Sequence, residues 1–540
     1  MPIHPLEFSE TRSFSKLMTD YLLEDERVEG FIHRFPSDEN LIKQQQEKAQ
    51  HPIHRKVLCK ALKKQYSQSI PTWKEEYPGL EQRIDALESE GVFTVTTGHQ
   101  LNLAGGPLYF LYKIAGTIAL AKRLNAKNPG FKTLPVFWMA TEDHDWAEVN
   151  HFYFKGKKFE SKDSIPAAVG RAKADLAMPV LEELRKEFGH IEQIQECLER
   201  CLDAYAKAET LADATRILVQ QLFADSDLLI LDADDRELKA LMVPMVKEEL
   251  FGTRSADLIE SKTQELANRY FAQVNPREIN LFYLDDRLRG RITVSPDGFE
   301  VVDGHMLFDQ EQLEDLMENE PEKFSPNVVL RPLFQEMILP NLAYLGGGGE
   351  LAYWMQLKPL FEHYKLPFPV LILRTSMVCL SEKAWRRIRK YDFRLRDLFL
   401  DPNHYMRKSF FNESGADRSL TKAMDDFQAI SDYLRGTAER LDPTLVPSVE
   451  AELAKQERGM KRLRKKFFRA VKRREKHTFQ NLEAIREEIF PEGVLQERRD
   501  SVFDLSLHLN QEMISFLIEE MDPLKKRFII FEPLPVKTEG

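Results

Sequence analysis

The chain is poor in cysteine. Only four cysteines occur in 540 residues, and their spacing fits neither a zinc site nor a redox motif. Cys197 and Cys201 lie one helical turn apart in an apolar stripe, which favours packing in the core. The other two are Cys59 and Cys379. So few cysteines in so long a chain are typical of a protein from a reducing compartment.

Long apolar runs and a leader-like start are also missing. The first residues, MPIHPLEFSETRSF, have neither the basic start nor the apolar stretch of a signal peptide. No apolar run approaches the roughly 20 residues that a bilayer-spanning helix needs. We therefore expect a soluble, cytoplasmic protein.

The composition is that of a globular protein with an acidic balance. Hydrophobic residues make up 43% of the chain and charged residues 30%. A chain of 540 residues exceeds the size of one core, so two or three domains are expected. The formal net charge of -11 argues against a general nucleic-acid binder, although it leaves room for a local basic patch.

Strand-like and helical patterns alternate in the middle of the chain. Residues 92–97 form a β-branched, apolar run, and a glycine-rich turn and a helical pattern over 107–126 follow it. A second buried strand is expected at 134–140. Strand, helix and strand in this order predict an α/β fold with a parallel sheet. Further strands are expected at 228–232 and 369–373, a hairpin at 282–294, and a helix at 351–364 after a four-glycine turn.

The chain divides into three parts. Residues 1–90 are polar with apolar residues at helical spacing, so we expect a helical segment that packs on the core. Residues 91–395 form the sheet core and carry an amphipathic helical insertion at about 155–225. Residues 396–540 form a helical domain with a strand-like ending, Arg527–Phe531, that rejoins the core.

The third part contains two helical apolar stripes, at 420–434 and 460–489. Pro443 and Pro447 mark a break between them. Steps of three and four residues predict an antiparallel coiled-coil hairpin, whose apolar face could also be a dimer surface. The strongly basic stretch 455–476 is best interpreted as a solvated helix face, and binding of a nucleotide or polyanion is the weaker alternative.

The first candidate site segment is TTGHQ at residues 96–100, followed by Gly105, Gly106 and Pro107. It lies where the first strand-to-helix loop is expected, and backbone N–H groups at a helix N-terminus favour phosphate or carboxylate. It matches neither a Walker loop nor a GxGxxG fingerprint. A tight turn whose glycines serve only the backbone is an equally good interpretation.

The second segment is Glu142-Asp143-His144-Asp145, with Asn150 and His151 downstream. It follows a strand at its carboxyl end, where open α/β sheets bind ligands. Three carboxylates so close together repel one another unless a cation lies among them, which could be Mg²⁺, a substrate amine or both. The imidazole could act as general base on an amine. A solvated acidic loop is the less favoured alternative.

The third segment is Gly346–Glu350, four glycines and a glutamate that lead into a helix. Close approach of backbone to a ligand would explain the glycines, and Tyr353 and Trp354 could wall the pocket. A flexible linker with core aromatics is the alternative. Arg374, followed by Thr375 and Ser376, projects from a strand toward the same sheet edge and could hold a carboxylate in a fork, or pair with an acidic neighbour.

Taken together, these segments resemble the cysteine-adding enzymes of bacillithiol biosynthesis, the BshC family of cysteine ligases. The order and spacing of the matches span most of the core, and the helical hairpin fits as well. The matching stretches are TTGHQLNLAGGPLYFLYK (96–113), PVFWMATEDHDWAEVNH (135–151), NLFYLDD (280–286), FSPNVVLRPLFQEMILPN (324–341), YLGGGGELAYWMQLK (344–358) and LQERRDSVFDL (495–505). One departure is His99, where the family commonly has a second glutamine, so Gln100 is the better candidate for a site residue.

The resemblance implies a fold and a reaction. The fold is a Rossmann-like core with insertions and a coiled coil, usually dimeric. The reaction joins the carboxyl group of L-cysteine to the amine of glucosaminyl-malate, the last step of bacillithiol synthesis. A free carboxylate does not form an amide at a useful rate, so ATP is the simplest activator, and ADP binding is associated with the fold.

From this reaction we expect two groups of site residues. His144 takes the amine proton, and Asp143 and Asp145, with Glu142, hold the sugar amine or a metal ion. The remaining residues are expected to bind substrate carboxylates or phosphate and to shape the pocket. They are Thr97, Gly98, His99, Gln100, Gly105, Gly106, Tyr109, Asn150, Gly348, Glu350, Tyr353, Trp354, Arg374 and Ser376.

Two other classes of protein compete with this interpretation. A metal-dependent amidase or hydrolase could use His144, Asp143, Asp145 and His151, but the chain has no HExxH motif and no clear third histidine. A non-catalytic coiled-coil protein that binds nucleic acid could use the basic helix, but it would leave the glycine-rich loops without a purpose. We therefore expect small-molecule substrates, a homodimer, and no membrane or nucleic-acid partner.

Overall fold

A five-stranded parallel sheet forms the centre of the computed structural model, which describes residues 2–165, 167–302, 304–412, 415–509 and 512–533. Its strand order is β13-β12-β2-β3-β6, and every neighbouring pair is parallel. The α/β class and the parallel sheet predicted from the sequence are confirmed. The strands are β2 (Val92–His99), β3 (Lys132–Met139), β6 (Leu229–Asp232), β12 (Asn341–Gly346) and β13 (Val370–Leu373).

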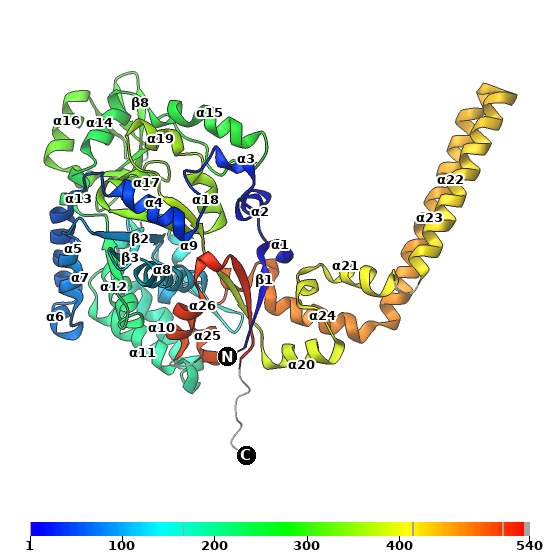
Figure 1. Cartoon of the computed structure of the whole chain (residues 1–540), viewed down its shortest axis with the longest axis horizontal. Helices are drawn as coiled ribbons and strands as arrows, with labels where there is room; N and C mark the ends of the chain where they lie inside the picture. Colours follow the sequence, from blue (N-terminus) through cyan, green and yellow to red (C-terminus); the bar gives the residue numbers. More distant parts are fainter. Residues whose placement is uncertain (1, 166, 303, 413–414, 510–511, 534–540) are drawn as a thin grey trace, which may run out of the picture.

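The sheet is buried on both faces, which is why its strands read as continuous apolar runs. Every residue of β2 is buried. The crossover helix α8 (Tyr109–Lys127) packs along β2 and β3, and α4 (Asp38–Lys48) packs beside β12 and β13. Figure 1 shows these helices against the sheet in the compact body of the molecule.

Among the described residues three further sheets lie around the core, the smallest of which pairs β4 (His151–Phe154) with β5 (Lys157–Glu160). An antiparallel sheet of order β10-β9-β8-β7-β11 contains the predicted hairpin as β7 (Leu281–Leu284) and β8 (Arg289–Ser295). A three-stranded sheet of order β1-β15-β14 joins β1 (Ile3–Glu7) to β15 (Arg527–Phe531), the strand expected at the end of the chain. Its third strand, β14 (Ser376–Cys379), follows β13 after two residues. The other strands of the antiparallel sheet are β9 (Gly298–Val301), β10 (Met306–Phe308) and β11 (Phe324–Pro326).

Several elements differ in detail from the sequence expectation. The N-terminal segment begins with β1 before its helices, because residues 3–7 find a partner in β15. The insertion stripe is two helices, α10 (Met178–Phe188) and α11 (Glu192–Lys207), because the chain turns at Gly189. The helix expected at 351–364 is likewise divided into two helices, α18 (Gly348–Trp354) and α19 (Lys358–His363).

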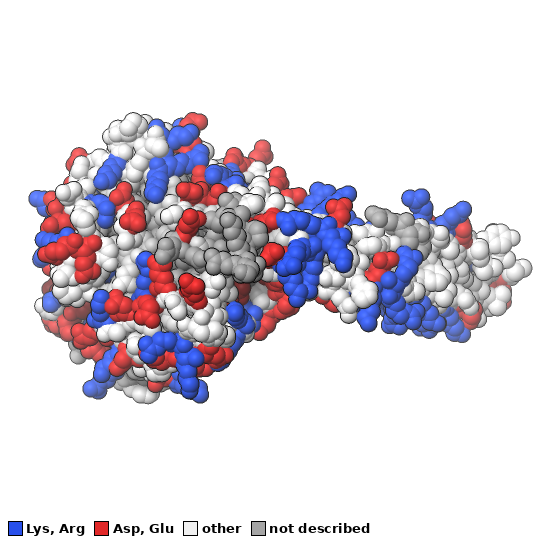
Figure 2. Space-filling model, turned by 90° about the horizontal axis from the view of Figure 1, so that it is seen from below, with Lys and Arg blue, Asp and Glu red and all other residues white. Residues whose placement is uncertain are grey.

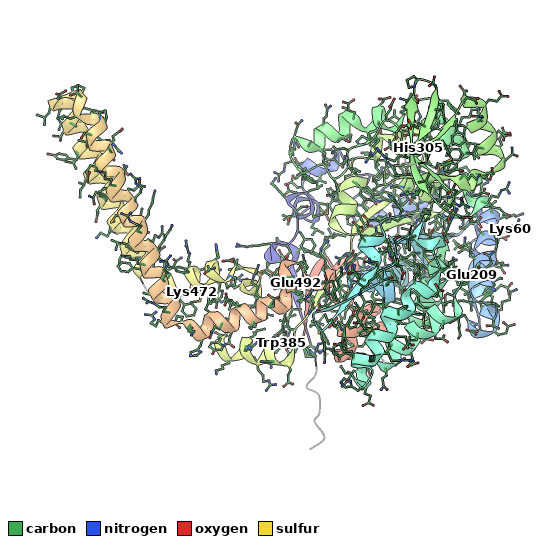
Figure 3. The ribbon with its side chains drawn as sticks, turned by 180° about the vertical axis from the view of Figure 1, so that it is seen from behind. Lys60, Glu209, His305, Trp385, Lys472 and Glu492 are labelled. Carbon is green, nitrogen blue, oxygen red and sulfur yellow. The ribbon has the colours of Figure 1, made fainter. Side chains whose placement is uncertain are left out.

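A helical hairpin projects from the body as a stalk (Figure 1). It consists of α22 (Ala416–Leu441) and α23 (Val446–Arg474), which pack side by side, and α24 (Lys476–Ile489) leads back to the body. The second predicted helix is therefore divided where the chain bends at Glu475. Lys472 lies at this bend, its ammonium 3.5 Å from the centre of the Phe479 ring (Figure 3).

The stalk is exposed on most of its surface. Blue side chains run along it in Figure 2, as the basic stretch of α23 predicts. Its large exposed apolar side chains are Ile430, Tyr433, Leu434, Leu441, Leu445, Leu463 and Phe467. The hairpin alone thus leaves much of its apolar seam uncovered. Among the described residues, no helix is long and apolar enough to cross a membrane.

A fully buried ion pair ties α4 to the segment before β12. The side chains of Lys48 and Glu336 are both 0% exposed, with Nζ 3.3 Å from Oε2. Burial lowers the pKa of Lys48 and raises the pKa of Glu336. The other Glu336 oxygen accepts hydrogen bonds from Gln335 (2.9 Å) and Asn341 (2.6 Å). The carboxylate is therefore fully engaged in the interior.

We expect Lys48→Met to lower the free energy of unfolding by about 3–5 kcal/mol, because it leaves Glu336 buried without its counter-ion. Denaturant unfolding followed by circular dichroism measures the loss. Lys43→Met on the same helix removes a surface pair with Glu39 and should cost less than about 1 kcal/mol. The double variant Lys48→Met/Glu336→Leu should recover most of the stability. A single variant as stable as wild type would refute this account.

Candidate active site

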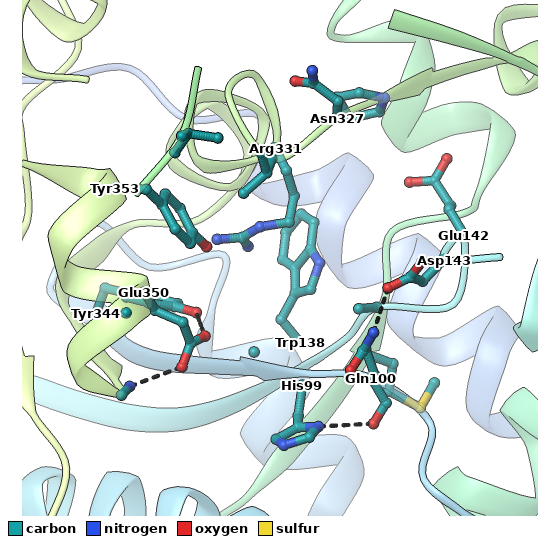
Figure 4. A pocket seen from close by; sticks show the side chains of 18 of the residues that line it. His99, Gln100, Trp138, Glu142, Asp143, Asn327, Arg331, Tyr344, Glu350 and Tyr353 are labelled. Atoms are coloured by element: carbon teal, nitrogen blue, oxygen red, sulfur yellow. Dashed lines mark hydrogen bonds between the residues drawn. The ribbon is translucent and has the colours of Figure 1, made fainter. Parts of the chain in front are cut away.

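A cavity of about 720 Å³ opens at the carboxyl ends of the central strands. Residues from all three candidate segments line it, although these segments are far apart in the sequence (Figure 4). The expected site residues on its wall are Gly98, His99, Gln100, Tyr109, Glu142, Asp143, Gly348, Glu350, Tyr353 and Arg374. Its position agrees with the general rule for ligand sites in open α/β sheets.

Glu350 is the centre of a tight polar cluster on one wall. Its carboxylate lies 2.5 Å from the ammonium of Lys113, which also donates to the Gly98 carbonyl at 2.9 Å. The Tyr344 hydroxyl (2.7 Å) and the Gly347 N–H (2.8 Å) donate to the same carboxylate. Burial alone would raise the pKa of Glu350, but Lys113 and these donors lower it to about 2. Glu350 is therefore ionised at any working pH.

The glycines before Glu350 are needed for close packing as well as for access to the cavity. A Cβ atom on Gly348 would lie 2.9 Å from the Met18 side chain. Backbone from Gly347 to Gly349 also lines the cavity. Close backbone approach was the reason that the sequence suggested for this run of glycines, and the structure adds a protein neighbour to it.

His99 is buried at the base of the cavity, and its ring contacts Tyr109 and Phe110. Its Nδ1–H donates to the Gln100 carbonyl at 3.1 Å, which leaves Nε2 buried without a partner among the described residues. Burial, reinforced by the positive charge of Lys113, lowers the pKa of His99 to about 3. The imidazole is therefore neutral at physiological pH.

The side chains of the acidic segment 142–145 contact different groups. Asp143 accepts a hydrogen bond from the Gln100 amide at 2.6 Å, and Glu142 lies 2.6 Å from the buried Lys239. Asp145 caps the short helix α9 (Trp146–Val149) and does not line the cavity. Over the described part of the chain, no group of three or more His, Cys, Asp and Glu side chains could hold a metal ion.

His144 also lies outside the cavity wall. Its Nδ1 is 3.0 Å from the Nη1 of Arg289, which does line the cavity. A guanidinium can only donate, so Nδ1 accepts and the ring hydrogen is on Nε2. The ring also contacts Phe282. In this arrangement His144 holds Arg289.

Other expected site residues lie behind the wall. Asn150 donates to the Ser161 carbonyl, and the Thr97 hydroxyl donates to the Leu345 carbonyl. Gly105 and Gly106 form a buried turn with φ of 77° and 51°, and a Cβ atom on Gly106 would lie 2.2 Å from Asn102. These two glycines therefore serve the turn. Trp354 is buried and stacks on Tyr344, and Ser376 bonds to Glu497.

Arg374 reaches the cavity but is already paired. Its guanidinium holds the Glu497 carboxylate through two hydrogen bonds of 2.9 and 2.6 Å, and both side chains are almost fully buried. The plane of Arg374 also lies over the Tyr109 ring. Of the two alternatives for this arginine, the structure shows the pairing with an acidic neighbour.

Several wall residues were not singled out from the sequence. They are Lys113, Trp138, Arg277, Arg289, Asn327, Arg331, Tyr344 and Arg498. Most lie inside the stretches that carry the family resemblance, so position in those stretches was the available signal. Their side chains could not be assigned to the cavity because helix and strand ends decide which of them face it.

Fixed positive charge exceeds negative charge on the wall. Three carboxylates, Glu142, Asp143 and Glu350, line the cavity. Six cations line it as well: Lys113, Arg277, Arg289, Arg331, Arg374 and Arg498. The cavity is therefore suited to an anionic ligand that also carries a cationic group, which would lie near Glu142 and Asp143.

Comparison with known proteins identifies the family to which the chain is similar. The family described as "Bacillithiol biosynthesis BshC, N-terminal Rossmann-like domain" matches residues 1–375, and its "C-terminal coiled-coil domain" matches residues 377–533. Curated relatives are named "Putative cysteine ligase BshC". The protein of Flavobacterium johnsoniae is 38% identical over 98% of this chain and 99% of its own length. Those of Flavobacterium psychrophilum and Christiangramia forsetii are each 37% identical over 98% of this chain, and over 100% and 99% of their own lengths.

Because His99 is buried and neutral, we expect the unfolding free energies of wild type and His99→Gln to depend differently on pH. With a lowered pKa, the stability of the neutral ring is present above the unfolded value near 6.5 and is lost as pH falls toward about 3. Between pH 7 and pH 5, wild type should therefore lose about 2 kcal/mol more unfolding free energy than the glutamine variant. Denaturant unfolding at both pH values measures this. The exposed His190→Gln serves as the control, and equal losses in wild type and His99→Gln would rule the idea out.

Proposed function

The chain belongs to the BshC family of bacillithiol biosynthesis, and on that basis we propose that it is a ligase that joins L-cysteine to glucosaminyl-malate. The bond formed is an amide between the cysteine carboxyl group and the amine of the sugar. This is the last step of bacillithiol formation.

The observation that carries the proposal is the charge pattern of the cavity. Glucosaminyl-malate has carboxylates at one end and an amine at the other. On one side the cavity has cations, such as Arg331, that form no ion pair with a carboxylate in the described part of the chain, and on another it has two carboxylates, Glu142 and Asp143 (Figure 4). A ligand of this kind can therefore satisfy both sets of charges in one orientation.

We assign the proton transfer to Asp143. The Gln100 amide fixes one of its oxygens, and the N–H groups of His144 and Asp145 donate to the other. As the amine nitrogen attacks the activated cysteine carbonyl carbon, a C–N bond forms and the C–O bond to the leaving phosphate group breaks. The amine proton passes to the carboxylate. In this assignment His144 takes no proton from the amine, and its role is to hold the Arg289 side chain in place.

Activation of cysteine requires a co-substrate, for which we propose ATP. Among the residues that the structure describes, no carboxylate forms an ion pair with four wall arginines, Arg277, Arg289, Arg331 and Arg498, and these suit phosphate oxygens as well as carboxylates. Glu142 is the wall carboxylate that would ligate the Mg²⁺ accompanying a nucleoside triphosphate, which leaves Asp143 to take the proton. Transfer of the terminal phosphoryl group of ATP to the cysteine carboxylate then releases ADP, and amide formation releases phosphate.

We also propose a cytoplasmic homodimer. All four cysteines are buried and unpaired, as expected of a reducing compartment. The apolar side chains left open on α22 and α23 would be covered by a second copy of the hairpin.

The direct test is a thiol profile of a deletion strain with and without the restored gene. The proposal requires loss of bacillithiol and accumulation of glucosaminyl-malate in the deletion strain, and recovery on complementation. Normal bacillithiol in the deletion strain would refute the proposed function.

Asp143→Asn should reduce bacillithiol in the complemented strain at least about 100-fold, because an amide cannot accept the amine proton. Asp145→Asn is the matched control. It also removes one carboxylate charge, two residues further along the chain, but the Asp145 side chain caps α9 and lies outside the cavity. It should keep product within a few-fold of wild type. Equal loss in the two variants would contradict the assignment to Asp143.

A further inference from the structure

Arg331 is held in a cage of aromatic rings on the cavity wall. It is the first residue of α17 (Arg331–Ile338). Its guanidinium carbon lies 5.8 Å from the Trp138 ring centre, 5.4 Å from that of Tyr344 and 5.8 Å from that of Trp354. Figure 4 shows the guanidinium projecting between Tyr353 and Trp138. Such rings stabilise a cation without neutralising its charge.

The charge of Arg331 lacks a carboxylate partner, unlike those of its neighbours. Lys113 is paired with Glu350, and Arg374 with Glu497, but within the described parts of the chain no carboxylate forms an ion pair with Arg331. Its Nη1 donates to the Gln335 side chain at 3.0 Å, and its Nη2 is buried with no acceptor among those residues. A buried donor on a charged group is costly when it is left without an acceptor.

The anchor of Arg331 is itself fixed. The Gln335 amide nitrogen donates to Glu336 at 2.9 Å, and Glu336 also binds the buried Lys48. Gln335 can therefore present only its oxygen to Arg331. Burial acts to lower the pKa of Arg331, but Tyr353, Tyr344 and Glu350 raise it overall, so the guanidinium stays charged.

From this geometry we propose that Arg331 is the carboxylate-binding residue of the cavity. Its planar fork matches a carboxylate, and a bound carboxylate supplies both the missing charge and the missing acceptor. Resting on the function proposed above, the group bound is a malyl carboxylate of the sugar substrate. The cysteine carboxyl group has to react, whereas the malyl carboxylates pass through the reaction unchanged.

The test is calorimetric titration of the full-length protein with glucosaminyl-malate and with methyl glucosaminide, which lacks the malyl group. Arg331→Gln should weaken binding of glucosaminyl-malate about 10- to 100-fold, and Arg331→Lys by less. Binding of methyl glucosaminide should not change between wild type and the variants. Arg287→Gln, on the exposed turn between β7 and β8, removes the same charge outside the cavity and should change binding less than about twofold.

Four other results would overturn the inference. The first is equal binding of glucosaminyl-malate by wild type and Arg331→Gln, which leaves the proposed function standing. The second is that Arg331→Gln weakens the binding of ATP or inorganic phosphate titrated without the sugar substrate, which assigns Arg331 to phosphate. The third is that Arg331→Gln weakens the binding of glucosaminyl-malate and of methyl glucosaminide equally, at an unchanged melting temperature. This result indicates that Arg331 affects the cavity in general and does not bind the malyl group. The fourth is a wild-type protein that does not bind glucosaminyl-malate, which defeats the substrate assignment as well. Should Arg331→Gln melt early, Arg331→Lys decides the question.

Discussion

The buried pair of Arg374 and Glu497 connects the two halves of the chain. Arg374 ends the central sheet and Glu497 comes from the C-terminal domain, and their side chains are 4% and 1% exposed. The Ser376 hydroxyl and the Met377 N–H donate to the same carboxylate, so Glu497 also fixes the start of β14. Removing either partner would leave a buried charge. The cavity wall near Arg374 therefore depends on both domains, and Arg498 adds a second contribution from the C-terminal one.

The charges of the cavity fall into two classes. Lys113 and Glu350 neutralise each other within the protein, as do Arg374 and Glu497. These pairs give the site its shape, because each is held at one position by several contacts. Arg331 instead lies among aromatic rings, and Arg289 contacts Phe282 and His144, so their charge is available for a ligand. A count of charged residues on the wall thus overstates what a substrate meets.

The sequence was sufficient for the central sheet and for the hairpin of β7 and β8, but not for the pairing of β1. Residues 92–97 and 134–140 are apolar because both faces of their strands are covered, and this pattern is local. Strand β1 has no such pattern because none of its residues is fully buried, and its partner β15 is more than 500 residues away. In the site, residues at strand ends such as Gly98 and Asp143 could be anticipated. The placement of His144 outside the cavity could not, because it depends on Arg289 from a different sheet.

The pairing of β1 with β15 has a consequence for how the protein is made. Strand β15 is the middle strand of its sheet, with β1 on one side and β14 on the other. On a ribosome that adds about 5–20 residues per second, β1 would wait roughly half a minute to two minutes for its partner. During that time an unpaired strand edge is open to other chains. We therefore expect the N-terminal segment to be prone to pairing with other chains until synthesis is nearly complete.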